Sequence, residues 1–523
     1  MANKKLNLGK SQVLHADRKV EANCNIDADD LTTHAFVTGM TGSGKTGLLL
    51  RVVTEAVQAG VPQVIFDIKG DLLNIIQTLD TPRGHELSRK MAIRCLTPGA
   101  THGESVNLLH GLQDPDGVQE SVTAILKLLG RNYDAIQSDD HSFLSTVIRT
   151  RHAAGEPCTL VDLIYATMEP SFTMLGALPL EQAFGLKPRA ALAAALNNLL
   201  CAPSFEPWRS GTPLDFGTLL APRKDKRVPI IIYSVHHLID ESDKMFALSL
   251  AFEAMVRYMR EQEGSSQLRT LLCIDEVAGL MPPHPSNPVT KLPLLTLIKQ
   301  GRGYGIGVLL ATQNPMDLDY KGMGNMGTWI VGRLKTSNDR ERIVKGIVED
   351  GVFDAHKLHR KIGALLPRQF VLARNSNIVP FATADVDVEL SGPMPTRRIV
   401  ELYDSKALVS VDRTAILFDR MEEARRLYSY DASYAPRLKD IETQLAELGH
   451  EEVLESSPII EMDSIDFSDK TAMKMFNELR KDTAKNLALT ATGYGCYPNV
   501  TVAEAAGKPA LIKAIVTYRL KSE

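Results

Sequence analysis

The sequence has no long hydrophobic run, no paired cysteines and little excess charge, and each absence excludes a class of protein. No stretch approaches ~18 consecutive apolar residues, which a membrane-spanning helix requires, so no membrane span is expected. The N-terminus lacks the apolar core of a signal peptide. A net charge of −4 over 523 residues argues against a surface that coats nucleic acid, although a local basic patch such as a pore lining remains open.

Cysteine and histidine are placed in ways that disfavour disulfides and metal sites. The six cysteines are scattered and form no CxxC pair, which fits a reduced cytoplasmic location with cysteines as small core residues. His236 and His237 are adjacent, so their side chains diverge. His356 and His359 could share a helix face, but no third ligand accompanies them.

Apolar runs of strand length alternate with helical patterns along much of the chain. The predicted strands are 35–38, 61–67, 228–233, 270–275, 307–312, 329–333 and 370–373. The main helices predicted with them are 47–59, 241–263 and 294–301. In 241–263, apolar residues recur at three- and four-residue steps, which indicates a face packed on a core. Continuous apolar strands alternating with helices predict a parallel sheet covered on both faces.

Residues 39–46 fit the pattern GxxxxGK[ST], between a predicted strand and a predicted helix. Glycines let main-chain N–H groups converge on phosphate oxygens, and the helix N-terminus adds positive potential. Lys45 is expected to reach the β- and γ-phosphates of ATP, and Thr46 to ligate Mg²⁺. The predicted nucleotide-binding residues are Gly39, Met40, Thr41, Gly42, Ser43, Gly44, Lys45, Thr46 and Gly47.

Two acids follow the apolar strand 270–275, at the tip of which a nucleotide's metal would lie. Asp275 is expected to hold Mg²⁺ through water, and Glu276 to orient and deprotonate the attacking water. Taken alone, the pair could equally be two acids at a strand end on the surface. Together with the phosphate loop, it predicts the catalytic carboxylate of an ATPase.

Polar residues also follow two further predicted strands. Gln313 comes directly after 307–312, where its side chain could sense the γ-phosphate. Asp67 and Lys69 come at the end of 61–67, at the sheet edge where ligands bind, and could face the nucleotide or a neighbouring subunit. On spacing alone, a simple turn explains Asp67 and Lys69 equally well.

Phosphoryl transfer places charge on the γ-phosphate, which an arginine, often from a neighbouring subunit, can stabilise. The candidates are Arg302, Arg333, Arg340 and Arg342. Arg302 ends a predicted helix eleven residues before Gln313, and Arg333 ends a predicted strand. An exposed, solvated side chain is the alternative for each.

The predicted fold class is α/β: a RecA-like P-loop ATPase core with a mainly parallel sheet, a helical insertion and a helical C-terminal region. We expect a short N-terminal segment over 1–33 and the ATPase domain over 34–395, with the insertion at about 98–227. The Pro-Met-Pro at 393–395 is a plausible boundary. Beyond it, residues 396–523 are expected to be mostly helical, with helical patterns at 421–427, 437–448 and 472–485.

These motifs, in this order, resemble the HerA/FtsK superfamily of ring-forming DNA-pumping ATPases, and in particular the bacterial HerA-like branch. The matching strings are LTTHAFVTGMTGSGKTG, FDIKGDL, LLCIDEVAGLMPP, PLLTLIKQGRGYGIGVLLATQNPMDLDYKG and GTWIVGRLKTSNDRERI. Together they span about residues 31–345.

The resemblance implies roles for individual residues. Lys45 and Thr46 fall on the positions that bind phosphate and Mg²⁺, Asp275 and Glu276 on the acidic pair, and Gln313 on the glutamine after the late strand. The arginine that acts in trans falls on Arg302, with Arg333 as a weaker second. The 38 residues before the loop are too few for the N-terminal barrel with which many HerA proteins dock partners.

The resemblance also implies a hexamer with ATP sites between subunits and double-stranded DNA in the central channel. The leading hypothesis is therefore an ATP-driven DNA translocase or helicase, with pore-facing basic residues at 223–227 or 335–342. The alternative is a regulatory or assembly ATPase that activates a partner effector such as a nuclease, for example in antiphage defence. A motor that moves protein in a secretion-type machine is a third hypothesis.

Overall fold

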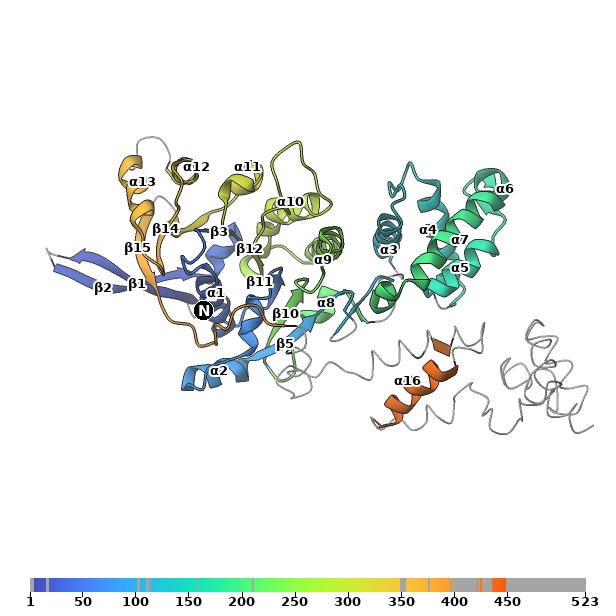
Figure 1. Ribbon diagram of the computed structural model, residues 1–523, viewed down its shortest axis with the longest axis horizontal. Helices are drawn as coiled ribbons and strands as arrows, with labels where there is room; N and C mark the ends of the chain where they lie inside the picture. The colour runs from blue at the N-terminus through green and yellow to red at the C-terminus, as the bar shows by residue number, and fades with distance from the viewer. Residues whose placement is uncertain are drawn as a thin grey trace, which may run out of the picture. The chain divides into compact units, whose positions relative to one another are not determined.

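The computed structural model (Figure 1) describes most of the first 395 residues and short pieces beyond them. The described residues are 4–15, 18–100, 104–109, 112, 114–156, 158–208, 211–348, 354–374, 377–395, 398, 421, 424–425 and 435–447. The chain divides into two compact units, Met1–Val411 and Asp412–Glu523.

The first unit is built on one sheet with the strand order β2-β1-β15-β14-β13-β3-β12-β11-β4-β10-β5. The strands are β1 Lys5–His15, β2 Arg18–Asp27, β3 Ala35–Thr38, β4 Gln63–Asp67, β5 Met91–Leu96, β10 Val228–Ser234, β11 Ser265–Asp275, β12 Tyr304–Thr312, β13 Thr328–Val331, β14 Gln369–Arg374 and β15 Asn377–Thr383. From β13 to β5 all neighbours pair in parallel, whereas β14, β15, β1 and β2 extend the sheet with antiparallel pairs. The predicted α/β class with a mainly parallel sheet is confirmed.

Helices cover both faces of the sheet. They are α1 Lys45–Gln58, α2 Pro82–Lys90, α9 Glu241–Arg260, α10 Lys291–Gln300, α12 Ser337–Ile347 and α13 Ala355–Ala364, with the short α11 Tyr320–Met323. Side chains along a strand alternate between the faces. Accordingly, Leu272 and Ile274 of β11 join the core under α9 and α10, whereas Leu271 and Cys273 join the core under α1. This two-sided burial explains why the strands are apolar throughout.

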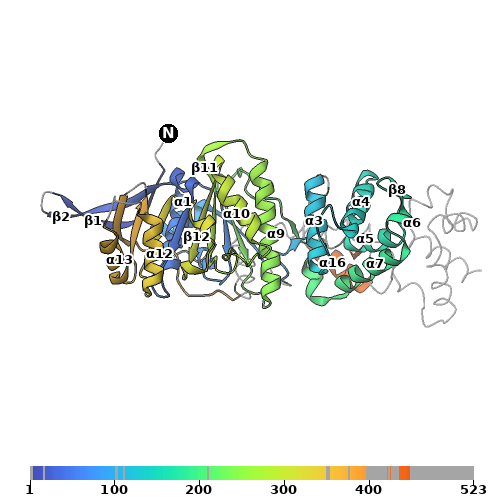
Figure 2. The same cartoon turned by 90° about the horizontal axis from the view of Figure 1, so that it is seen from above.

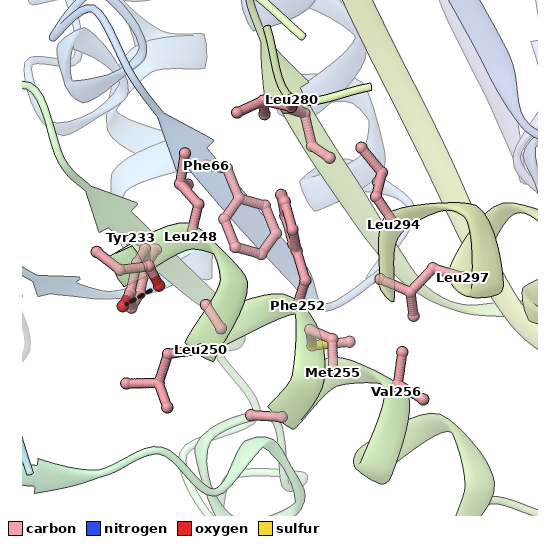
Figure 3. Packing of buried hydrophobic residues seen from close by; sticks show 14 of the residues in the cluster. Phe66, Tyr233, Leu248, Leu250, Phe252, Met255, Val256, Leu280, Leu294 and Leu297 are labelled. Carbon is pink, nitrogen blue, oxygen red and sulfur yellow. Dashed lines mark hydrogen bonds between the residues drawn. The ribbon is translucent and has the colours of Figure 1, made fainter. Parts of the chain in front are cut away.

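The stripe along 241–263 faces the core, as predicted. In α9, Leu248, Phe252 and Met255 are buried, and Phe252 packs on Phe66 of β4 with ring centroids 4.8 Å apart. Figure 3 shows these side chains together, with the Tyr233 hydroxyl donating to the Ala247 carbonyl oxygen at 2.8 Å. These contacts hold α9 against β4, which pairs with β11, and against β10, the next strand after β4.

Residues 98–227 are mostly helical in the described part, as Figure 2 also shows. Their helices are α3 Pro115–Leu128, α4 Asp139–Ala153, α5 Leu160–Met168, α6 Leu180–Ala183, α7 Leu186–Cys201 and α8 Phe216–Leu219. Two small ladders, β6 Val106–Asn107 with β9 Thr212–Pro213 and β7 Met174–Leu175 with β8 Leu178–Pro179, close the loops between them. Lys127 of α3 pairs with Glu253 of α9 at 2.9 Å, which ties this helical segment to the sheet.

The N-terminal residues differ from the short polar segment that the sequence suggested. Residues 5–15 and 18–27 form the antiparallel pair β1–β2, and Gly9 of β1 pairs with Thr383 of β15. A short 3₁₀ helix, η1 Ala28–Thr33, then leads into β3. β1 and β2 therefore form one edge of the sheet, and β1 is fixed by a strand that lies more than 350 residues later.

The second unit is described only in part. Helix α16, Ala435–Glu447, covers most of the predicted helix 437–448, and Arg425 pairs with Glu442 at 3.0 Å. The predicted helix 472–485 lies outside the described residues, and so does most of 421–427. None of the helices in the described part of the chain has the length and apolar character needed to span a bilayer.

Candidate active site

Four parallel strands end side by side and bring the predicted site residues to one edge of the sheet. Thr38 of β3 is in register with Thr312 of β12, and Asp275 of β11 with Asp67 of β4. β12 lies between β3 and β11. The phosphate loop, Gln313 and the acidic pair therefore follow three adjacent strands at their carboxyl ends, where ligands of such sheets bind.

The phosphate loop has the backbone that its glycines allow. Gly42 and Gly44 have φ values of 78° and 92°, in the left-handed region that glycine enters without strain. A Cβ at Gly39 would come within 2.7 Å of the Ser43 Oγ and 3.2 Å of the Gly332 Cα, so there is little room for a side chain at this position. The buried Ser43 Oγ has no hydrogen-bond partner among the described residues. A polar atom left open in such a loop fits a loop that receives phosphate oxygens.

Lys45 opens α1 and is nearly buried, with 8% of its surface exposed. Its ammonium donates to the Gly39 carbonyl oxygen at 2.6 Å, across the loop. Burial lowers the pKa of Lys45, and the nearby negative charges of Asp275 and Glu276 oppose that shift. Because these charges act on Lys45, the lysine and the acidic pair belong to the same site.

Glu276 is held in a specific orientation. Its Oε2 lies 2.5 Å from the Lys69 ammonium, and its Oε1 accepts from the Thr312 hydroxyl at 3.1 Å. Its backbone is left-handed, with a φ of 63°, which costs energy for a residue with a side chain and is common at functional sites. The carboxylate is thus held on one side by Lys69, in the turn after β4, and on the other by Thr312, at the end of β12.

Asp275 and Asp67 are buried side by side at the ends of β11 and β4. Burial raises the pKa of Asp275 to about 6, opposed chiefly by Lys69, and that of Asp67 to about 7. Asp67 accepts main-chain N–H groups from Gly70 at 2.9 Å and Leu73 at 3.3 Å, so it shapes the turn that presents Lys69. Asp67 is therefore structural.

Asp275 remains the acid suited to a metal. Within the described residues, no group of three or more His, Cys, Asp or Glu side chains is arranged to hold a metal ion. A Mg²⁺ ion here would thus depend on one carboxylate, a hydroxyl and phosphate oxygens. Such a donor set suits Mg²⁺, which usually binds to few protein ligands together with phosphates.

Gln313 contacts the phosphate loop directly. Its Oε1 accepts a hydrogen bond from the Thr41 hydroxyl at 2.6 Å. Thr41 is an exposed residue at the tip of the loop. The glutamine is therefore placed to respond to whatever the loop binds.

The four candidate arginines fall into two groups. Arg340 donates to the Leu334 and Lys335 carbonyl oxygens at 3.0 and 2.9 Å, and Arg342 donates to the Leu318 carbonyl oxygen at 2.6 Å. These two hold loops of their own subunit together. Arg302 and Arg333 have exposed side chains.

Arg302 and Arg333 lie at opposite ends of the parallel strands: Arg302 before the start of β12 and Arg333 after the end of β13. Arg333 follows β13, two residues after the strand ends, and its carbonyl oxygen accepts the Met40 N–H at 2.8 Å. Arg302 lies in η4, Gly301–Gly303, which directly precedes β12. A nine-residue strand is about 30 Å long. Arg302 is therefore too far from Gln313 to reach the phosphates of its own subunit.

Two residues beside the loop were not identified from the sequence. The Arg368 N–H donates to the Ser43 carbonyl oxygen at 2.8 Å. The Leu390 Cδ1 lies 3.8 Å from the position that a Cβ of Gly47 would take. Both lie more than 300 residues after the loop. The only local sign was an arginine in the Pro-Arg-Gln turn before a strand, which carries no motif.

Comparison with known proteins finds a family match in the N-terminal part of the chain. Residues 12–114 match the family model described as Helicase HerA-like C-terminal. That segment contains β3, the phosphate loop, α1 and β4. No curated protein sequence matches the chain.

Several solved structures resemble the chain at low identity. The plasmid coupling protein TrwB in complex with a non-hydrolysable ATP analogue is 16% identical, with a TM-score of 0.47 over 75% of this chain and 97% of that one. VirB4 of Thermoanaerobacter pseudethanolicus is 13% identical, with a TM-score of 0.46 over 72% and 96%. The genome packaging NTPase B204 from Sulfolobus turreted icosahedral virus 2 is 11% identical, with a TM-score of 0.28 over 67% and 97%. These values are too low for any residue role or activity to be transferred.

The family match and the site agree. The matched segment supplies the loop that carries Lys45, and the same sheet places Glu276 and Gln313 beside that loop. The N-terminal part of the chain is therefore similar to the HerA-like family, and the same sheet carries a P-loop site.

Proposed function

We propose that the chain hydrolyses ATP with Mg²⁺ and works as a ring-shaped motor that translocates or unwinds DNA. One observation carries the ATPase part: Lys45, Gln313 and Glu276 gather at one sheet edge from three adjacent strands. A phosphate-binding loop, a sensor and an oriented carboxylate are the parts that phosphoryl transfer to water needs.

The residues divide the chemical work between them. Main-chain N–H groups of residues 42–46 and the Lys45 ammonium would bind the triphosphate. Glu276 would accept a proton from a water whose oxygen forms a bond to the γ-phosphorus, while the bond to the β–γ bridging oxygen breaks. Thr46 and Asp275 would hold Mg²⁺, which neutralises phosphate charge.

The position of Arg302 supports a ring. Because Arg302 lies at the opposite end of β12 from Gln313, an action of its exposed guanidinium on a nucleotide would have to be on that of a neighbouring subunit. Of the segments proposed to contact DNA, 223–227 is partly neutralised, because Arg223 and Arg227 both donate to Asp225 at 2.9 Å. Lys224, Lys226 and Lys335 stay exposed and are the stronger candidates for a basic pore lining.

The test is the steady-state ATPase rate with and without double-stranded DNA, on protein whose mass is measured in solution. We expect a hexamer whose rate rises with DNA and falls to background in Lys45→Ala. Replacing Lys224 and Lys226 by alanine should lower the DNA stimulation and leave the rate without DNA unchanged. A monomer with full activity, or activity in Lys45→Ala, would reject the proposal.

A regulatory or assembly ATPase that activates an effector such as a nuclease is the second candidate. The helical insertion exposes large apolar side chains, with which a partner protein would make contact under this proposal. These are Ile136, Tyr165, Met174, Leu178 and Leu186. An ATPase rate that does not respond to DNA, together with nucleotide-dependent binding of a partner, would favour this candidate over the motor.

A further inference from the structure

The strand order sets the direction in which a nucleotide must lie. Glu276 and Gln313, which would act at the γ-phosphate, follow β11 and β12 on one side of β3. The phosphate loop itself follows β3. The nucleoside, at the other end of the triphosphate, would therefore extend away from these two residues, toward the side of β3 where β13, β14 and β15 lie.

Arg368 lies against the loop on that side. Its Cγ is 3.2 Å from the position that a Cβ of Gly44 would take, and its N–H donates to the Ser43 carbonyl oxygen. Its φ of 66° is unusual for a residue with a side chain. The side chain is half exposed, and its guanidinium donates to the Thr383 carbonyl oxygen at 3.3 Å and pairs with Asp385 at 2.6 Å. The backbone and Cγ of Arg368 thus lie against the phosphate loop, and its guanidinium is held at the end of β15 with half of the side chain accessible.

Leu390 lies beside the first turn of α1, in the segment that runs from the end of β15 toward the turn after β4. This segment, residues 384–394, is anchored at both ends. Arg51 of α1 donates to the Asp385 carbonyl oxygen at 3.1 Å, and the Met394 N–H donates to the Gly70 carbonyl oxygen at 3.1 Å. Between these anchors, Leu390 is 54% exposed and its Cδ1 is 3.8 Å from the Cβ position of Gly47.

We propose that Arg368 and Leu390 form the binding surface for the nucleoside of the bound nucleotide, a purine base with its ribose. The guanidinium would stack on the aromatic base, and the leucine would cover an apolar face of the nucleoside. A guanidinium stacked on the ring face and a leucine make no hydrogen bonds to the edge of the base. The surface would therefore bind the base through its aromatic face. This inference rests on the proposed ATP site. It identifies residues that would contact the base and ribose, which the phosphate loop does not bind.

The experiment compares a ligand with a nucleoside and a ligand without one. Binding of magnesium ATP and of magnesium tripolyphosphate is measured by calorimetry on the full chain, for the unchanged protein and for Arg368→Asn and Leu390→Ser. Asparagine tolerates the left-handed backbone at 368, and position 390 is exposed, so both variants should fold. Arg149→Asn and Leu292→Ser make the same chemical changes at exposed positions on α4 and α10.

We expect each test variant to weaken ATP binding by about tenfold and to leave tripolyphosphate binding unchanged. The two control variants should bind both ligands like the unchanged protein. Unchanged ATP affinity in both test variants, or equal weakening for both ligands, would overturn the assignment of a nucleoside surface. Failure of the unchanged protein to bind either ligand would instead reject the proposed ATP site itself.

Discussion

The Lys69 ammonium lies 2.5 Å from Oε2 of Glu276, and the Thr312 hydroxyl donates to the other carboxylate oxygen. Residues at the ends of β4 and β12, the strands on either side of β11, therefore orient Glu276, the acid that we propose accepts a proton from water. We predict that Lys69→Met lowers kcat by about tenfold or more while the KM for ATP changes little, because orientation of a general base affects the chemical step.

Three variants separate this role from a general loss of charge. Lys69→Arg should restore part of the rate, and Lys90→Met should have no effect, since Lys90 pairs with Glu86 on α2. Glu276→Gln should bind ATP and hydrolyse it slowly. A faster enzyme after Lys69→Met would show that the pair restrains Glu276 rather than orienting it.

Gln313 accepts a hydrogen bond from Thr41 at the tip of the phosphate loop. We predict that Gln313→Ala keeps ATP binding but lowers kcat by about tenfold or more. Thr41→Val should cost less, about fivefold, because one neutral hydrogen bond contributes about 1 kcal/mol. Single-turnover kinetics measure both effects, and an equally large loss in kcat and in ATP affinity for Gln313→Ala would contradict a sensing role.

The sequence predicted the parts of the fold that depend on local patterns. The phosphate loop, the strand ends at Asp275 and Thr312, and the helices beside them were predicted within a few residues, because burial on both faces makes each strand continuously apolar. The antiparallel pair β1–β2 was not predicted, since its pairing with β15 joins residues far apart in the chain. Arg368 and Leu390 were missed for the same reason: only the folded sheet brings them to the loop.

Arg302 lies at the far end of β12 from Gln313, so its proposed action must occur between subunits. We predict that Arg302→Ala binds ATP normally and loses turnover. Because Lys45→Ala is defective at a different position, mixing the two inactive variants should restore part of the activity through sites that combine an intact loop with an intact Arg302. Arg333→Ala serves as the comparison at the other end of the parallel strands, and absence of recovery in mixed oligomers would contradict the assignment of Arg302.

Arg51 is a buried cation, 2% exposed, that joins three parts of the first unit. It donates to the Asn7 and Asp385 carbonyl oxygens at 2.8 and 3.1 Å and pairs with Glu55 at 3.1 Å. We predict that Arg51→Leu lowers the free energy of unfolding by about 3 kcal/mol, because it leaves buried acceptors without partners. Urea denaturation measures this, with Arg89→Leu on the surface of α2 as the control; equal stability of the two variants would reject the role of Arg51.

His34, 2% exposed, makes the stability of the core depend on pH. Its Nδ1 accepts the Val308 N–H at 3.2 Å, so Nε2 carries the proton that is donated to the Ile298 carbonyl oxygen at 2.7 Å. Burial lowers the pKa of His34 from 6.5 to about 4, and the positive charge of Arg302 adds to that shift. A second proton would have to enter at Nδ1, which faces an N–H group.

The unfolded chain therefore binds a proton at His34 near pH 6.5, whereas the folded chain binds it only near pH 4. The contribution of neutral His34 to the free energy of unfolding is complete above pH 6.5. It decreases as the pH falls toward 4, by up to about 3 kcal/mol. We predict that His34→Asn, in which asparagine suits the left-handed φ of 64°, is less stable than the unchanged protein at pH 7.5 and that this difference narrows at pH 5. Urea midpoints for both proteins at each pH measure the effect, and parallel pH dependence of the two would show that His34 is not the group that titrates.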